Sequence, residues 1–95
     1  AQLKRFIEEE PDDPFNIYAL ANEYLAEKPD EALALFEQLL VSHPDYLGTY
    51  YQAGKLYLSM GKIKKAEETF RQGMAVAINQ NKAKTLNELR NALNE

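Results

Sequence analysis

Few residues of this chain have the types and spacing that a catalytic centre needs. His43 is the only histidine, and it precedes Pro44 at an expected helix end, where an imidazole can interact with the last carbonyl groups and the helix dipole. Ser42 and Ser59 have no plausible general base and no glycine-flanked turn that would expose a nucleophile. The chain has no cysteine, which excludes a thiolate nucleophile, a disulfide framework and a thiolate zinc site. We therefore expect no enzymatic activity and no cofactor.

Two charged clusters could bind ions. Carboxylates crowd residues 8–13 and could attract a divalent cation, but the cluster lacks the glycine and spacing of a calcium loop, which favours a solvated helix junction without metal. Lys62, Lys64 and Lys65 form a basic patch at an expected helix start. No aromatic residues interleave with these lysines, so we expect no nucleic-acid binding. No glycine-rich loop is present to hold a phosphate.

The length and composition predict one small water-soluble domain. The chain has 95 residues, of which 45% are hydrophobic and 27% charged. No apolar run approaches the roughly 18 residues that span a bilayer, and charges throughout the first ten residues argue against a signal peptide. We expect a cytoplasmic protein without membrane contact.

The net charge of −4 is unevenly distributed along the chain. Residues 1–45 hold eleven acidic and three basic residues, a net charge of −8, whereas residues 46–95 hold four acidic and eight basic residues, a net charge of +4. Such asymmetry can favour a head-to-tail contact or steer a charged partner. The alternative is two solvated faces that differ only in composition.

Apolar residues recur at helical spacing along the whole chain, and no segment alternates with period two. The pattern predicts helices over residues 2–9, from Pro14 to about 27, from Pro29 to about 43, from 45 to about 60, over 63–78 and over 81–95. Asp13 is the expected N-cap of the second of these helices, and Gly61 closes the fourth. The expected fold class is all-α.

Two stretches of the chain match each other when Pro11 is aligned with Pro44. Helical positions then pair as Ile17 with Tyr50, Leu20 with Ala53, Ala21 with Gly54 and Tyr24 with Tyr57 and, after one residue is dropped in the turn, Ala32 with Ala66 and Phe36 with Phe70. Repeats of this period are helix–turn–helix units that must stack on neighbours to bury their apolar faces.

These paired positions resemble the tetratricopeptide-repeat family, in particular its small bacterial-type stand-alone domains. The resemblance implies a right-handed helical-hairpin solenoid, in which residues 1–10 are a partial repeat helix, 11–44 the first repeat, 45–78 the second repeat and 81–95 a C-terminal capping helix. Three features depart from the family pattern. The first turn is short and lacks glycine, Ile78 replaces the closing proline so that its helix can run on, and Gly73 replaces an alanine.

The resemblance also implies a concave groove lined by the first helix of each repeat. The groove residues that it assigns, expected to be exposed, are Tyr18, Asn22 and Leu25 in the first repeat and Tyr51, Gln52, Lys55 and Leu58 in the second. Aromatic rings beside amides and a lysine suit an extended peptide or a short helix. The alternative is that the last helix, or a second copy of the chain, covers these rings.

We therefore expect a non-catalytic protein-interaction or adaptor module that binds a protein or peptide partner in this groove. The alternative from another class is a homo-oligomeric structural module, such as a homodimer, that uses the groove or the last helix for self-association.

Overall fold

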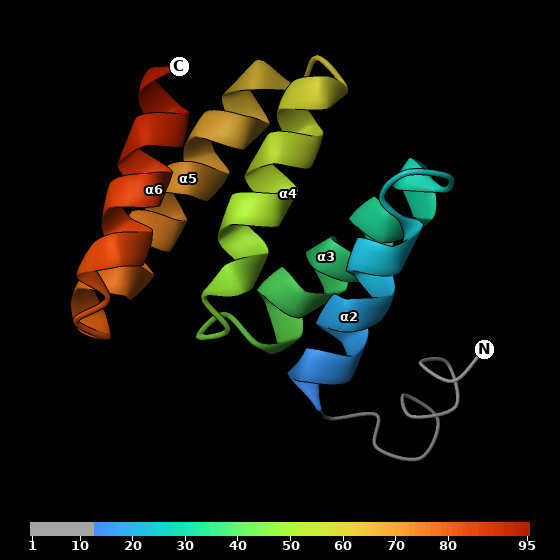
Figure 1. The fold of residues 1–95 in the computed structure, drawn as a ribbon, viewed down its shortest axis with the longest axis horizontal. Coiled ribbons are helices and arrows are strands. Elements are labelled where there is room, and N and C mark those ends of the chain that lie inside the picture. The colour runs from blue at the N-terminus through green and yellow to red at the C-terminus, as the bar shows by residue number, and fades with distance from the viewer. Residues whose placement is uncertain (1–12) are drawn as a thin grey trace. The chain divides into compact units, whose positions relative to one another are not determined.

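The computed structural model describes residues 13–95, which form five α-helices and no strand (Figure 1). The helix expected over residues 2–9 and most of the acidic cluster lie outside the described residues. Two compact units make up the fold, one ending at Tyr46 and the other beginning at Leu47. The all-α prediction is confirmed.

The first unit is a hairpin of α2 (Pro14–Tyr24) and α3 (Pro29–Ser42), which pack against each other. Asp13 caps α2 as expected, because its Oδ1 accepts a hydrogen bond of 2.9 Å from the Phe15 N–H. Each helix has a proline in its first turn, where the missing N–H costs nothing. Residues next to the helix starts therefore determine where both helices begin.

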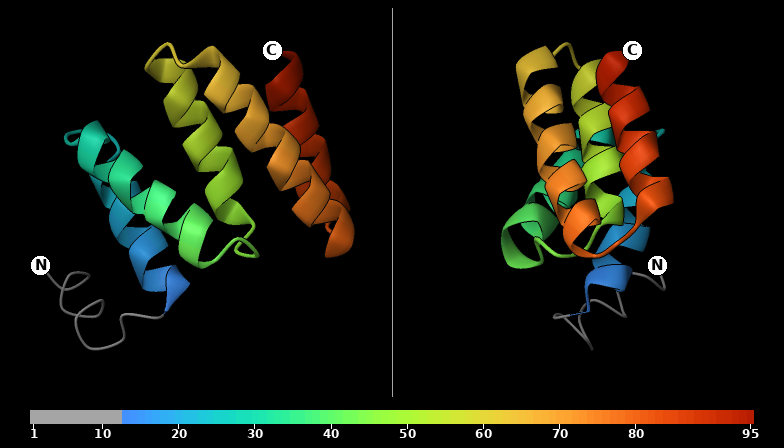
Figure 2. Two further views of the ribbon diagram at one scale, coloured as in Figure 1. Left: turned by 180° about the vertical axis from the view of Figure 1, so that it is seen from behind. Right: turned by 90° about the vertical axis from the view of Figure 1, so that its left-hand side faces the viewer.

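The second unit consists of α4 (Gly48–Ser59), α5 (Ile63–Asn79) and α6 (Ala83–Asn94). Helix α5 packs against both α4 and α6, and α6 also contacts α4. Both views in Figure 2 show α6 running alongside α5. Helix α5 has 17 residues against 14 in α3, so the helix without a closing proline does run on, as expected.

Two residues with positive φ follow the ends of α4 and α5 in the second unit. Gly61 has φ 78°, and the Lys62 N–H bonds to the Tyr57 carbonyl at 2.9 Å, which closes α4 in a Schellman motif. Asn81 has φ 57°, and the Lys82 N–H bonds to the Ala77 carbonyl at 2.9 Å in the same way. Asparagine tolerates this left-handed conformation better than most residues, which explains the polar turn before α6.

The paired repeat positions form the cores of the two units. All of them are buried except Tyr24, which is half-buried. Its counterpart Tyr57 lies two residues inside the end of α4, whereas Tyr24 is the last residue of α2. Because α2 ends at Tyr24 itself, this side chain stays partly in water, with the Lys28 Nζ 5.4 Å from its ring centroid.

Close helix crossings in the second unit require glycine at two positions. A Cβ on Gly54 would lie 2.7 Å from Cδ1 and Cζ of the Phe70 ring. A Cβ on Gly73 would lie 2.5 Å from the Tyr50 Cβ and 3.1 Å from the Leu89 Cδ1. The large Tyr50 side chain thus explains why Gly73 departs from the alanine of the family pattern.

Candidate functional site

Residues 13–95 meet the requirements of neither a metal site nor a membrane-spanning helix. No group of three His, Cys, Asp or Glu side chains in residues 13–95 could hold a metal ion. No helix in the same range is long and apolar enough to cross a membrane. His43 is the C-cap residue of α3, and its backbone N–H bonds to the Leu39 carbonyl at 2.8 Å.

The face of α2 carries Tyr18, which is part of an aromatic cluster inside the first unit. Its ring meets the buried Phe36 ring edge-on, with centroids 6.1 Å apart, and lies 5.3 Å from the Tyr46 ring. Such pairs add about 0.5–1.5 kcal/mol beyond the area that they bury. Tyr18 was expected to be exposed. The structure shows it half-buried, because its ring packs inside the first unit.

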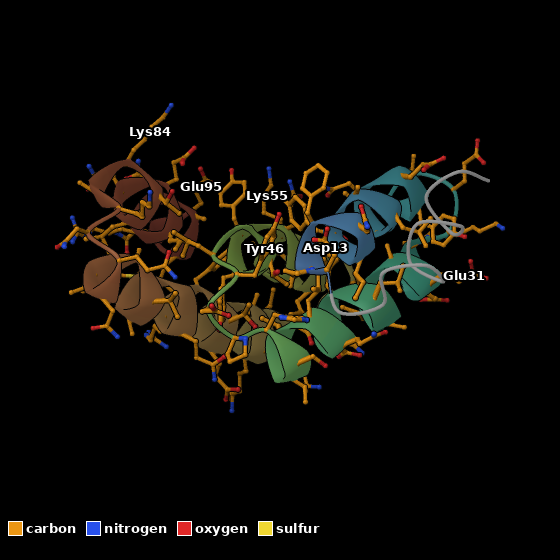
Figure 3. All side chains as sticks on the ribbon, turned by 90° about the horizontal axis from the view of Figure 1, so that it is seen from below. Asp13, Glu31, Tyr46, Lys55, Lys84 and Glu95 are labelled. Atoms are coloured by element: carbon orange, nitrogen blue, oxygen red, sulfur yellow. The ribbon has the colours of Figure 1, made fainter. Side chains whose placement is uncertain are left out.

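Tyr46 completes this cluster and was not evident from the helical pattern, because it lies in the turn after α3. Burial raises the pKa of its phenol above the usual value of 10.0, and the nearby Tyr18 and the Asp13 carboxylate raise it further. Figure 3 labels Asp13 and Tyr46, which lie close together. The only sequence signal for this contact is an aromatic residue at the expected start of the second repeat.

We expect Tyr46 to make the protein less stable in alkali. The folded state holds the phenolic proton at pH values where the unfolded chain has lost it, so this contribution is complete below about pH 10 and is lost as the pH rises through the folded pKa. Urea unfolding at pH 8 and pH 10.5 measures the loss. Tyr46→Phe should lose less stability between the two pH values than the parent chain does.

Asp13→Asn is the matched control for this effect, because asparagine keeps the helix cap and removes the charge. This variant should lower the pKa of Tyr46. Its loss of stability between pH 8 and pH 10.5 should then come closer to that of Tyr46→Phe. An identical pH dependence in the parent and in Tyr46→Phe would exclude the tyrosine as its source.

Asn22 on α2 and Leu25, the C-cap residue of α2, are the other predicted site residues of the first repeat, and both are half-buried. The Asn22 Oδ1 is buried and makes no hydrogen bond among the described residues. Such an oxygen carries a desolvation cost of about 1–3 kcal/mol unless water or a ligand satisfies it.

The face of α4 carries the remaining predicted residues. Tyr51, Gln52 and Leu58 are half-buried, and Lys55 is exposed. The Lys55 Nζ lies 5.2 Å from the Tyr51 ring centroid, a cation–π contact one helical turn apart. Figure 3 shows Lys55 on the surface of α4. This pair presents an apolar ring and a positive charge together.

The structure therefore groups the predicted residues by helix. Tyr18 and Asn22 lie on α2 and Leu25 is its C-cap residue, all in the first unit, and the four others lie on α4 in the second unit. That the two faces line one groove stays a prediction.

Comparison with known proteins identifies the family. A family model described as tetratricopeptide repeat matches residues 23–86. The crystal structure of a tetratricopeptide repeat domain protein from Salinibacter ruber is 46% identical, with a TM-score of 0.83, over 85% of this chain and 92% of that one. The solution NMR structure of a tetratricopeptide repeat domain protein from the same organism is also 46% identical, with a TM-score of 0.83, over 87% and 85% of the two chains. The curated proteins searched include no match. On the family match and on these identities, the chain belongs to the tetratricopeptide-repeat family.

Proposed function

We propose that this chain is a non-catalytic interaction module that binds a peptide segment or a short helix through the first-helix faces of its two repeats. Tetratricopeptide repeats serve generally as protein-interaction modules, and the family is typically non-catalytic. The residues proposed to contact the partner are Tyr18 and Asn22 on α2, its C-cap residue Leu25, and Tyr51, Gln52, Lys55 and Leu58 on α4.

The observation that best supports this function is the Tyr51–Lys55 pair on α4. Tyrosine is enriched among residues that dominate binding energies, because it brings a large rigid ring and a hydroxyl to the contact. Lys55 lies over that ring at 5.2 Å, and its amino group can donate to backbone carbonyls or carboxylates of a partner. Neither side chain is fully buried, so both are accessible on this face.

The test is partner capture from native lysate by the double variant Tyr51→Ala with Lys55→Ala. We expect this variant to lose most of the captured partner, because removal of a central tyrosine typically costs 2 kcal/mol or more, roughly a thirtyfold loss of affinity. Its melting temperature should fall by only a few degrees, since neither residue is core. Tyr18 is left unchanged in this test because its packing on Phe36 would confound the result.

The matched control is Arg71→Ala with Gln72→Ala, two exposed residues on α5. This control should capture the partner as the parent chain does. Undiminished capture by the α4 variant, or equal loss by both variants, would count against the α4 face as the binding site.

Self-association is the second candidate function, and the opposite net charges of the two halves favour it. A concentration series in analytical ultracentrifugation separates the two functions. A stable monomer supports the interaction module, and a tight dimer that is weakened by Tyr51→Ala supports the oligomer.

A further inference from the structure

A cavity of about 280 Å³ lies within the second unit, between the end of α4, the start of α5 and the end of α6. Its volume falls below the roughly 300–1,000 Å³ of sites for small molecules and cofactors. It has the scale of one long side chain rather than of a metabolite. The cavity extends the proposed binding face, because Leu58 of α4 lines it.

The cavity has apolar walls. Leu58, Ile63 and Leu93 line it, together with the buried Phe70. Ile63 is 51% exposed although it is aliphatic, so one wall leaves apolar surface in water. Contact with the methylene groups of an incoming side chain would remove that surface from water. Each Å² of apolar surface buried in this way stabilises the complex by about 25 cal/mol.

Two glutamates also line the cavity, Glu67 from α5 and Glu95 directly after α6. Residues 47–95 hold only four acidic residues against eight basic ones. Half of those acids line this cavity, whereas none of the eight bases does. The nearby Lys65 lies over the Tyr57 ring, with its Nζ 5.6 Å from the centroid.

We infer that this cavity binds an arginine or lysine side chain of a peptide partner. The aliphatic stem would pack on Leu58, Leu93 and Phe70 while the cationic head reaches the carboxylates of Glu67 and Glu95, as long basic side chains do when they cover apolar surface. Arginine suits the pair better than lysine, because its planar guanidinium has five donors for carboxylate oxygens. The inference rests on the proposed function and names the chemistry of the partner.

The test is an NMR titration of the ¹⁵N-labelled chain with two acetylated pentapeptide amides. One has the sequence glycine–leucine–arginine–leucine–glycine, and the other has citrulline, the uncharged isostere, in place of arginine. We expect the arginine peptide to shift the amide signals around Leu58, Glu67 and Leu93 and to bind roughly threefold to tenfold more tightly than the citrulline peptide. Glu67→Gln with Glu95→Gln should abolish this difference.

The matched control is Glu68→Gln with Glu88→Gln, which removes the other two acids of the same unit, both exposed and outside the cavity. This control should keep the preference for arginine. Equal binding of the two peptides, an unchanged preference in the Glu67/Glu95 variant, or shifts confined to the acidic first unit would each overturn the inference. Signals at the cavity that move with protein concentration alone would identify a second copy as the occupant and would also overturn it.

Failure of this inference is distinguishable from failure of the proposed function. If the Tyr51/Lys55 variant loses its partner while the Glu67/Glu95 variant keeps it and the arginine preference is absent, the function stands and the cavity has no part in it. If the Tyr51/Lys55 variant keeps its partner, the proposed function itself is wrong.

Discussion

A chain that ends at Gln80, without α6, is expected to lose most of its stability and to aggregate or self-associate. Leu89 is fully buried and Ala92 is 8% exposed, while Leu86 and Leu93 are half-buried. Complete burial of one leucine is worth about 1.5–3 kcal/mol, so the helix contributes several kcal/mol to a domain whose total stability is on the order of 5–15 kcal/mol. Urea unfolding and sedimentation velocity measure the two effects.

Helix α6 is suited to this role because its two faces differ. Its buried face lies on the second repeat, where the Leu89 Cδ1 approaches Gly73, and its outer face exposes Lys84, Asn87, Glu88, Arg90 and Asn91. A polar outer face is what a terminal helix of a repeat array needs. Figure 3 shows Lys84 projecting from α6.

Leu89→Ala tests the same contact at full chain length. It should cost about 2–5 kcal/mol, and Leu86→Ala, at a half-buried position of the same helix, should cost clearly less. A shortened chain that stays monomeric and as stable as the parent would show that α6 is not a required cap.

Gly54→Leu is expected to destabilise the fold far more than Gly48→Ala. Even the first side-chain carbon at position 54 would lie 2.7 Å from atoms of the buried Phe70 ring, so either the ring or the α4–α5 crossing must move. Overpacking of this kind costs about 1–3 kcal/mol and occasionally more. Gly48 is the first residue of α4 and only half-buried. Urea midpoints of the two variants give the comparison.

A second substitution shows whether the Phe70 ring is the obstacle. Phe70→Leu alone should destabilise the domain by leaving space, but combined with Gly54→Ala it should cost less than the sum of the two single changes, because the two sites share one contact. Equal urea midpoints for Gly54→Leu and Gly48→Ala, or strict additivity in the Phe70 pair, would contradict the crossing described above.

Sequence periodicity predicted the five described helices, since the same helical spacing that makes a helix amphipathic also selects its buried face. Two bounds were wrong: α2 ends at Tyr24 rather than at about residue 27, and α4 begins at Gly48 rather than at residue 45. The start of α2 at Asp13 and the end of α4 at Gly61 followed from local chemistry, the side-chain cap and the positive φ. The paired repeat positions then supplied ten of the sixteen buried hydrophobic residues in the described part of the chain, including the small residues at the helix crossings.

Contacts at the edges of the helices could not be predicted in the same way. Tyr18 lies off the apolar stripe by spacing, yet its ring reaches Phe36 and Tyr46, because side-chain rotamers decide where a long aromatic points. The cavity at Leu58 combines residues from three helices, and its two glutamates are ordinary surface acids by sequence. Helical periodicity leaves the contacts of such half-exposed positions undetermined.

Photo-crosslinking from the α4 face tests the central claim most directly. Tyr51→benzoylphenylalanine places a reactive ring at the proposed contact, and Gln72→benzoylphenylalanine places the same ring at an exposed position on α5. Irradiation in native lysate should give a defined adduct with another protein from position 51 and none from position 72. Equal adducts from both positions, or an adduct from position 72 alone, would contradict the α4 face as the binding surface. An adduct of twice the chain mass from position 51 would show instead that the face joins two copies of this chain.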